Sequence, residues 1–129
     1  TGLQEAFDRW LGGGKPAYVD KERLLFADGI ALVHRAGGIA VYAHPNWEGT
    51  RERIEPLVAL GLDGIEVRHP SHGAEDIKRL RGLVNQFGLV PSGGSDWHGA
   101  MGGSRILGCM KVNAEWLDVQ LERVAARAA

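Results

Sequence analysis

Cysteine and surplus charge are both nearly missing from this chain. Its 129 residues include a single cysteine, Cys109, which excludes a disulfide framework or a cysteine-rich zinc module and fits a reducing, cytoplasmic setting. The 15 basic and 16 acidic side chains give a net charge of -1, which argues against binding of DNA by bulk positive charge. No apolar run approaches the roughly 18 residues of a membrane span, and no signal pattern opens the sequence, so we expect no membrane partner.

Glycine, in contrast, is abundant. The chain contains 19 glycines, about twice the usual share of roughly 7%. They stand singly or in pairs between periodic segments, so they mark the ends of elements rather than low-complexity sequence. Hydrophobic residues make up 44% of the chain, which is enough for a packed core, and the length suits a single domain over residues 1–129.

Apolar side chains recur at helical spacing in five segments. The first predicted helix ends at Gly12, and Asp20 and Thr50 are candidate N-caps of the next two. Pro56 predicts that the third helix starts late or kinks, because proline lacks a backbone donor. The later predicted helices cover residues 20–36, 50–60, 77–87 and 113–128.

Short apolar runs alternate with these helices and predict strands. Their composition is typical of strands that are buried on both faces, as in parallel sheets. Helices that alternate with such strands predict an α/β fold with parallel pairing and right-handed crossovers. The predicted strands cover residues 39–43, 64–68 and 89–91, with a less regular one at 106–112.

Polar residues with metal-binding chemistry follow three of the predicted strands. The carboxyl ends of parallel strands meet at one edge of a sheet, where functional groups gather. Asp96 and His98 are two residues apart, so an extended segment would place both side chains on one face. With His44 they would make a ligand set suited to zinc, manganese or iron, and such a metal lowers the pKa of bound water to about 7.

Other interpretations of these residues remain open at this point. His44 alone could cap or hydrogen-bond a loop, and Glu66 could form a buried salt bridge with an arginine. His69 and His72 could be solvated loop residues. His34 lies inside a predicted helix, where a structural role is the simpler interpretation.

Three segments together resemble the later motifs of the PHP family, the polymerase and histidinol phosphatase domain. They are GGIAVYAHP at residues 37–45, GLDGIEV at 61–67 and GGSDWHG at 93–99, in the family's order and spacing. Residues 6–12 and 14–19, AFDRWLG and GKPAYV, resemble the branch that contains ribonuclease AM and the nucleoside 3',5'-bisphosphate phosphatase.

The resemblance implies a fold, a cofactor and an activity. The fold is a distorted (β/α) barrel of short parallel strands with outer helices. The cofactor is a cluster of divalent metal ions, usually zinc, manganese or iron, whose activated water attacks a phosphate ester of a nucleotide or short oligonucleotide. By this resemblance His44, Asp96 and His98 correspond to metal ligands, with Asp96 and His98 catalytic. The resemblance further implies that the substrate pocket is lined by Glu66, His69 and His72.

One family feature does not occur in this sequence. PHP domains begin with a His-x-His motif, and the only histidine before His44 is His34. We therefore expect residues 1–129 to be the C-terminal portion of a PHP domain, with an incomplete metal cluster and no activity alone. The alternative is a non-catalytic PHP-like module that acts through a protein partner. In either case exposed strand edges predict self-association.

Overall fold

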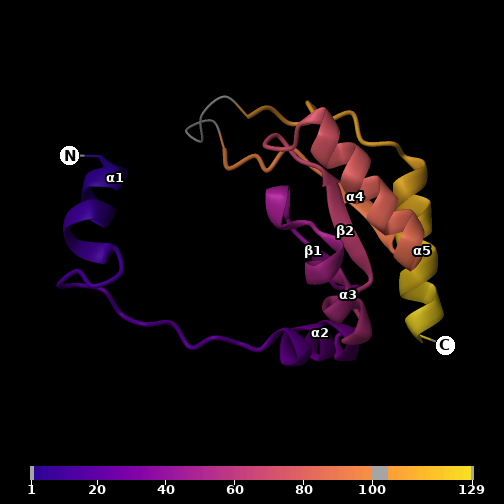
Figure 1. Cartoon of the computed structure of the whole chain (residues 1–129), viewed down its shortest axis with the longest axis horizontal. Coiled ribbons are helices and arrows are strands. Elements are labelled where there is room, and N and C mark those ends of the chain that lie inside the picture. The colour runs from indigo at the N-terminus through magenta and orange to yellow at the C-terminus, as the bar shows by residue number, and fades with distance from the viewer. Residues whose placement is uncertain (1, 100–104, 129) are drawn as a thin grey trace.

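The computed structural model describes residues 2–99 and 105–128 as an α/β arrangement around a small parallel sheet. Its strands are β1 (Val41–Tyr42), β2 (Gly64–Arg68) and β3 (Val90–Gly93). They lie in the order β1-β2-β3, and both neighbouring pairs are parallel (Figure 1). The predicted α/β class with parallel pairing is confirmed.

Helices connect and cover these strands. None of them, within the part of the chain that the structure describes, is long and apolar enough to cross a membrane. A short 3-10 turn, η2 (Asn46–Glu48), follows β1, and the N-terminal α1 (Leu3–Ala6) continues into the π-helical η1 (Phe7–Leu11). The longer helices are α2 (Phe26–Arg35), α3 (Arg51–Ala59), α4 (Ala74–Phe87) and α5 (Glu115–Ala128).

The core lies between the sheet and its helices. Ile65 and Val67 of β2 are fully buried, as are Leu80 of α4 and Ile54 of α3. Side chains alternate along a strand, so Glu66, between Ile65 and Val67, belongs to the opposite, polar face of β2. The strand therefore buries one face and presents the other toward the site.

Asp63 closes the amino end of the sheet. Its carboxylate is fully buried and accepts hydrogen bonds from the Ala40 amide at 2.8 Å, from His34 Nε2 at 2.8 Å and from Arg127 Nε at 2.8 Å. Burial raises the pKa of the Asp63 carboxyl, but the bonds from Ala40, His34 and Arg127 outweigh it and leave the pKa below its ordinary value. His34 thus has the structural role expected for it.

The first strand is shorter and more exposed than predicted. Only Val41 and Tyr42 pair with β2, and both are half-buried instead of buried on two faces. Ala40, the residue before β1, is held by Asp63 instead of by ladder pairing. The Ala40 carbonyl accepts hydrogen bonds from the amides of Asp63 and Gly64, and the Ala40 amide donates to the Asp63 carboxylate. These bonds replace ladder pairing, and β1 is an edge strand of the sheet.

The second predicted helix also begins later than expected. Asp20 does not cap it, because the Tyr18 hydroxyl donates to Asp20 Oδ1 at 2.8 Å. From Gly12 to Leu25 the chain is without helix or strand, and α2 starts at Phe26. In Figure 1 this extended segment joins α1 and η1, which stand apart, to the body of the molecule.

Three further elements differ from the sequence prediction. Helix α3 starts directly after Thr50 and accommodates Pro56 inside it, without a late start. Strand β3 ends at Gly93, two residues beyond the predicted end. The strand predicted for 106–112 is absent, because positive φ angles at Gly108 (75°) and Lys111 (45°) turn the chain there.

Candidate active site at the carboxyl ends of the strands

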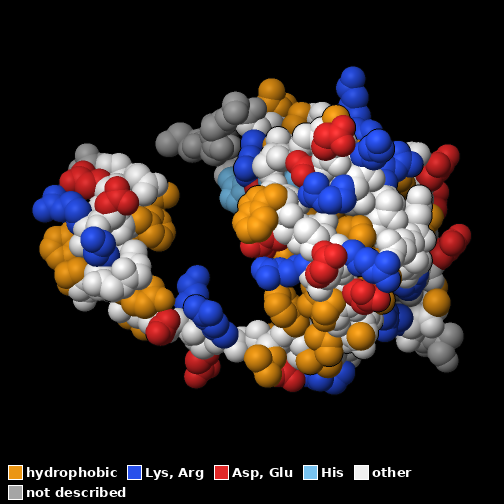
Figure 2. All heavy atoms as spheres, viewed as in Figure 1, with side chains coloured by type: hydrophobic (Ala, Val, Ile, Leu, Met, Phe, Trp, Pro, Cys, Tyr) orange, Lys and Arg blue, Asp and Glu red, His pale blue; other side chains and the backbone are white. Residues whose placement is uncertain are grey.

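Three loops meet at the carboxyl edge of the sheet, one after each strand. Histidine side chains reach the surface there, at the edge of the body that faces the N-terminal helix in Figure 2. His44, Asn46 and Asp96 adopt positive φ angles of 31°, 45° and 48°. Residues other than glycine adopt positive φ angles in only a few per cent of cases. Strained backbone conformations of this kind are concentrated at functional sites.

Asp96, after β3, is the acidic centre of this edge. Its Oδ2 contacts the Arg105 guanidinium and lies 3.4 Å from His69 Nε2, while Oδ1 lies 3.7 Å from His98 Nδ1. Desolvation raises the pKa of the Asp96 carboxyl, but the contact with His69 and the charges of Arg105 and His98 lower it overall. Asp96 is thus held as a carboxylate, the form that can bind a cation.

His98 has a ring nitrogen available for a ligand. Its Nδ1 lies 2.6 Å from the Asp96 carbonyl oxygen, which can only accept, so Nδ1 carries the proton. In the neutral ring Nε2 then has a free lone pair, and no described residue bonds it. The side chain is 67% exposed. A protonated Nδ1 held by a carbonyl is the usual arrangement of a metal-binding imidazole.

A hydrogen bond between His44 and Glu66 connects the loop after β1 to strand β2. The His44 amide donates to Glu66 Oε2 at 2.7 Å, so Glu66 fixes the turn that carries the His44 ring. No arginine pairs with Glu66 among residues 2–99 and 105–128, unlike the salt bridge considered from sequence. The His44 ring lies 5.2 Å from the His69 ring, measured between centroids.

His72 is buried and bonded on both sides. Its Nδ1 donates to the Val67 carbonyl at 2.9 Å, and its Nε2 accepts the Asn46 amide at 3.3 Å. The ring therefore ties the end of β2 to the loop after β1. Its contact with substrate stays a prediction, and any such contact must use the ring face.

His69 is buried but bonded on one side only. Ser71 supplies two contacts to Nδ1, from its amide at 3.2 Å and its hydroxyl at 2.6 Å. Nε2 is buried and has no hydrogen-bond partner among the described residues, although Asp96 Oδ2 is 3.4 Å away without hydrogen-bond alignment. A buried polar atom without a partner is uncommon and marks a place for a ligand.

The predicted residues gather only in part. Asp96, His98, His69 and His44 form a chain of neighbours, with Glu66 and His72 holding the loops. Within 2–99 and 105–128, however, no three His, Cys, Asp or Glu side chains converge as one metal ion requires. The ligand roles of His44, Asp96 and His98 stay predictions.

Arg105 is the residue that sequence reasoning missed. Its guanidinium contacts both the carboxylate and the carbonyl oxygen of Asp96. Its position in the sequence, at the end of the glycine-rich stretch that follows Asp96, could have indicated that Arg105 belongs to the same loop. An arginine beside a carboxylate at a strand end can also bind a phosphate, because its planar donors match phosphate oxygens.

Comparison with known proteins finds relatives that are named as hydrolases of phosphate esters. No protein-family profile matches it. The 3',5'-nucleoside bisphosphate phosphatase of Chromobacterium violaceum is 35% identical over 111 residues, which are 82% of this chain and 39% of that protein. A 5'-3' exoribonuclease of Haemophilus influenzae is 37% identical over 99 residues, 73% of this chain and 36% of the relative.

A solved structure supports the same relationship. A protein of Bifidobacterium adolescentis that is named as a metal-dependent phosphoesterase superposes with a TM-score of 0.75 at 29% identity. The match covers 93% of this chain and 44% of that protein. The chain is therefore related in sequence and fold to phosphoesterases and nucleases, and it spans less than half the length of these relatives.

Proposed function

We propose that the chain belongs to the PHP family and forms the C-terminal portion of a PHP domain. In this proposal β1, β2 and β3 are consecutive strands of a distorted barrel, and α2 to α5 lie on its outside. Support comes from the three motif-bearing loops at one edge of the parallel sheet and from the likeness to a named phosphoesterase over 93% of the chain.

The function we propose is hydrolysis of a phosphate ester with the help of divalent metal ions. One observation carries it: Asp96, as a carboxylate, and His98, with an unbonded Nε2, stand together on the strained loop after β3. These are the donor types that zinc, manganese and iron accept. We assign His44, Asp96 and His98 as ligands, and Asp96 and His98 as the residues on which catalysis depends most.

The described residues fit part of such a metal site. His98 offers a lone pair and Asp96 a carboxylate, whereas a third ligand within reach of both is not found among the described side chains. A bound divalent ion would supply a water that is acidic enough to attack phosphorus at neutral pH. We therefore propose that the set is incomplete in this chain and that the chain alone has little or no activity.

The substrate we propose is a small phosphorylated molecule, a nucleotide or short oligonucleotide. Two named relatives act on a nucleoside bisphosphate and on RNA. On this chain Arg105 provides donors for phosphate oxygens, and His69 lines the pocket with a buried ring nitrogen that has no partner among the described residues. Glu66 and His72 shape the pocket through the loops that they hold. The single cysteine supports a reducing, cytoplasmic setting for this activity.

An assay of two proteins tests the proposal. The product of the complete reading frame that contains this chain, and the 129-residue chain itself, are offered a nucleoside 3',5'-bisphosphate and a short 5'-phosphorylated RNA with Mn²⁺. We expect release of phosphate or nucleotide by the complete product, loss on chelation, and loss in His98→Ala. Hydrolysis that survives chelation, or that His98→Ala leaves unchanged, would contradict the proposal.

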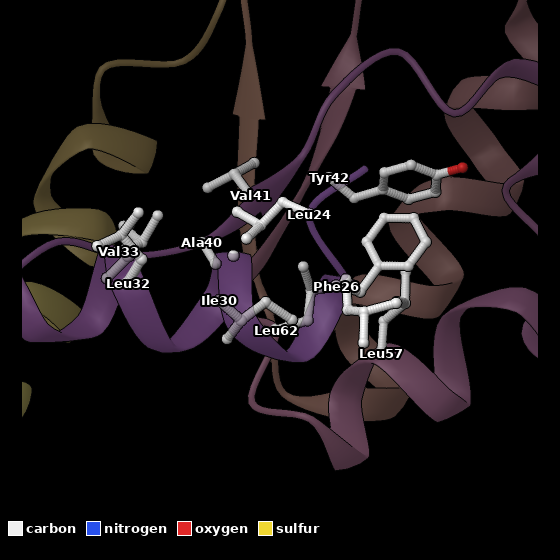
Figure 3. A pocket seen from close by; sticks show the side chains of 13 residues that line it. Leu24, Phe26, Ile30, Leu32, Val33, Ala40, Val41, Tyr42, Leu57 and Leu62 are labelled. Atoms are coloured by element: carbon white, nitrogen blue, oxygen red, sulfur yellow. The ribbon is translucent and has the colours of Figure 1, made fainter. Parts of the chain in front are cut away.

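One surface is exposed both in a portion of an enzyme and in the alternative, a non-catalytic module that acts through a protein surface. An apolar groove of about 610 Å³ lies beside the edge strand β1, between it and α2 (Figure 3). Phe26, Val33 and Val41 line it, and Phe26 is 66% exposed. We propose that a second copy of the chain covers it, because two β1 edges can pair antiparallel about a two-fold axis.

A further inference from the structure

Trp47 is the most exposed of the four tryptophans in the chain. It is 77% exposed, whereas Trp10 and Trp97 are about half exposed and Trp116 packs partly against the core. Tryptophan is highly buried on average in folded proteins, because its large ring is mostly apolar. Trp47 thus leaves a broad aromatic surface open to solvent.

The turn that carries Trp47 is held firmly, although the ring itself is exposed. From α4, the Arg79 guanidinium donates to the carbonyl oxygens of Asn46, at 2.5 Å, and of Gly49, at 3.0 Å. These two carbonyls flank Trp47. The Asn46 amide donates to His72 Nε2 at 3.3 Å. A side chain presented by a fixed backbone loses less conformational freedom on binding, so Trp47 is preorganised to meet a ligand.

Packing against the core fixes the same turn from below. A Cβ atom at Gly49 would collide with the fully buried Leu80 of α4 and would lie 3.2 Å from Pro45 Cβ. Only glycine therefore allows η2 to approach α4 this closely. The core thus sets the position of Trp47 relative to the carboxyl edge of the sheet.

Trp47 is also close to the proposed metal site. It follows His44 by three residues, so their Cα atoms are at most about 11 Å apart. Figure 2 shows hydrophobic side chains next to the histidines at this edge. The base of a nucleotide is joined to its phosphate through a single sugar. A base whose phosphate is held at the carboxyl edge must therefore rest on a surface near it, and Trp47 provides an aromatic one.

Polar groups beside the ring favour a nucleobase as its partner. A hollow of about 190 Å³ is lined by Trp47, Glu48, Thr50 and Arg53. Glu48 and Arg53 form an ion pair there at 3.0 Å. An aromatic face with donors and acceptors next to it suits a base, which has a flat face for stacking and polar edges for hydrogen bonds.

We propose that Trp47 binds the nucleobase of the substrate by stacking and makes the site selective for phosphate esters that carry a base. This inference rests on the proposed function for the presence of a nucleotide at the site. Stacking on an aromatic side chain tolerates every base, because each has a π face. The selectivity is thus for nucleotides as a class over plain sugar phosphates.

Two ligands that differ only in the base test the proposal. The product of the complete reading frame is titrated in a calorimeter, with EDTA to prevent hydrolysis. The ligands are adenosine 3',5'-bisphosphate and its analogue with hydrogen in place of the base. The wild type should bind the adenosine compound at least about tenfold more tightly. Trp47→Ala should weaken that binding about tenfold and change binding of the base-free analogue by less than about twofold.

Further variants separate stacking from simple apolar contact. Trp47→Phe keeps an aromatic face and should keep the affinity for the adenosine compound within about threefold of the wild type. Trp47→Leu is apolar without a π face and should lose most of what alanine loses. Trp10→Ala, at another exposed tryptophan, is the control and should bind both ligands normally. The exposure of Trp47 predicts an unchanged melting temperature in its variants.

Three results would contradict the inference. One is an equal loss of affinity for both ligands in Trp47→Ala. Another is a wild type that does not prefer the adenosine compound. The third is unchanged nucleotide affinity in Trp47→Ala together with a lower mass in light scattering, which would show that the ring contacts a second protein. Failure of the proposed function looks different: binding depends on the base and on Trp47 as expected, but no phosphate ester is hydrolysed when Mn²⁺ is supplied.

Discussion

The two ends of the sheet each hold an aspartate between a histidine and an arginine, and the two clusters differ in burial and in how fully their polar groups are paired. At the amino end Asp63 is fully buried between His34 and Arg127. At the carboxyl end Asp96, with its side chain 29% exposed, lies between His69 and Arg105. The residue types are the same, so composition alone does not distinguish a structural cluster from a functional one.

Satisfaction of polar groups does distinguish them. Asp63 has aligned hydrogen bonds from a backbone amide, a histidine and an arginine, which join segments up to 64 residues apart. The Asp96 cluster joins segments only up to 27 residues apart, and among the described residues it leaves the buried His69 Nε2 without a hydrogen-bond partner. The proposed function therefore rests on the carboxyl end, where a buried polar atom has no partner among the described residues.

The largest expected effect concerns activity at the carboxyl end. In the product of the complete reading frame, Asp96→Ala should lower the rate of phosphoester hydrolysis at least about a hundredfold, because even outer-shell changes at metal sites cost 10–100-fold. The melting temperature should change little. Asp20→Ala, at an exposed aspartate, is the matched control and should keep normal turnover. Near-normal turnover in Asp96→Ala would remove the assigned role.

The free energy of unfolding should depend more strongly on Asp63 than on Asp96. Asp63→Asn should lower the free energy of unfolding by about 1–3 kcal/mol, because the buried side chain accepts hydrogen bonds from Ala40, His34 and Arg127 that the amide cannot all replace. Asp96→Asn, at a partly exposed pair, should lower it by less than about 1 kcal/mol. Urea denaturation of the two variants measures both. Equal losses would show that the two clusters are not different in kind.

Acid should weaken the Asp63 cluster at the amino end. The native pKa of Asp63 is lowered, since hydrogen bonds from Ala40, His34 and Arg127 outweigh the effect of burial. Its stabilisation is therefore complete above its unfolded pKa of roughly 4, and it is lost as the pH falls through the lower native pKa. Unfolding free energy measured from about pH 5 to pH 2 should fall more steeply in the wild type than in Asp63→Asn. Parallel curves would contradict this assignment.

How much of this arrangement follows from sequence can be judged from single elements. Strand β2 was predicted with its observed bounds, because GIEVR stands between a glycine and a polar loop and is buried by α4. The site at the carboxyl edge could be located because polar residues follow three strands. The length of β1 could not be predicted, because it depends on the hydrogen bond that the Ala40 amide donates to the Asp63 carboxylate.

The finer features of the site needed the structure. Nothing in the sequence indicates that Ser71 contacts the His69 ring, or that Arg105 turns back onto Asp96. These contacts depend on loop conformations with positive φ at His44 and Asp96, which no pattern in the sequence indicates. The loss of Asp20 as a cap has a similar origin, because one hydroxyl, that of Tyr18, competes for its carboxylate.

The smallest expected effect concerns the open edge of the sheet. Light scattering of the 129-residue chain should give a mass that rises above 13.9 kDa with concentration, because β1 and its apolar groove are exposed. Val41→Lys should restore the monomer, since lysine on an edge strand blocks pairing. Val119→Lys, at a 41% exposed position on α5, is the control. A monomer at every concentration would contradict self-association through this edge.

Metal content tests most directly the claim that the carboxyl end is the functional one. The product of the complete reading frame is purified as wild type, Asp96→Asn and Asp63→Asn, and zinc, manganese and iron are measured by mass spectrometry. We expect metal in the wild type and in folded Asp63→Asn, and a marked loss in Asp96→Asn despite its normal fold. Full metal content in Asp96→Asn, or its loss only in Asp63→Asn, would contradict the account.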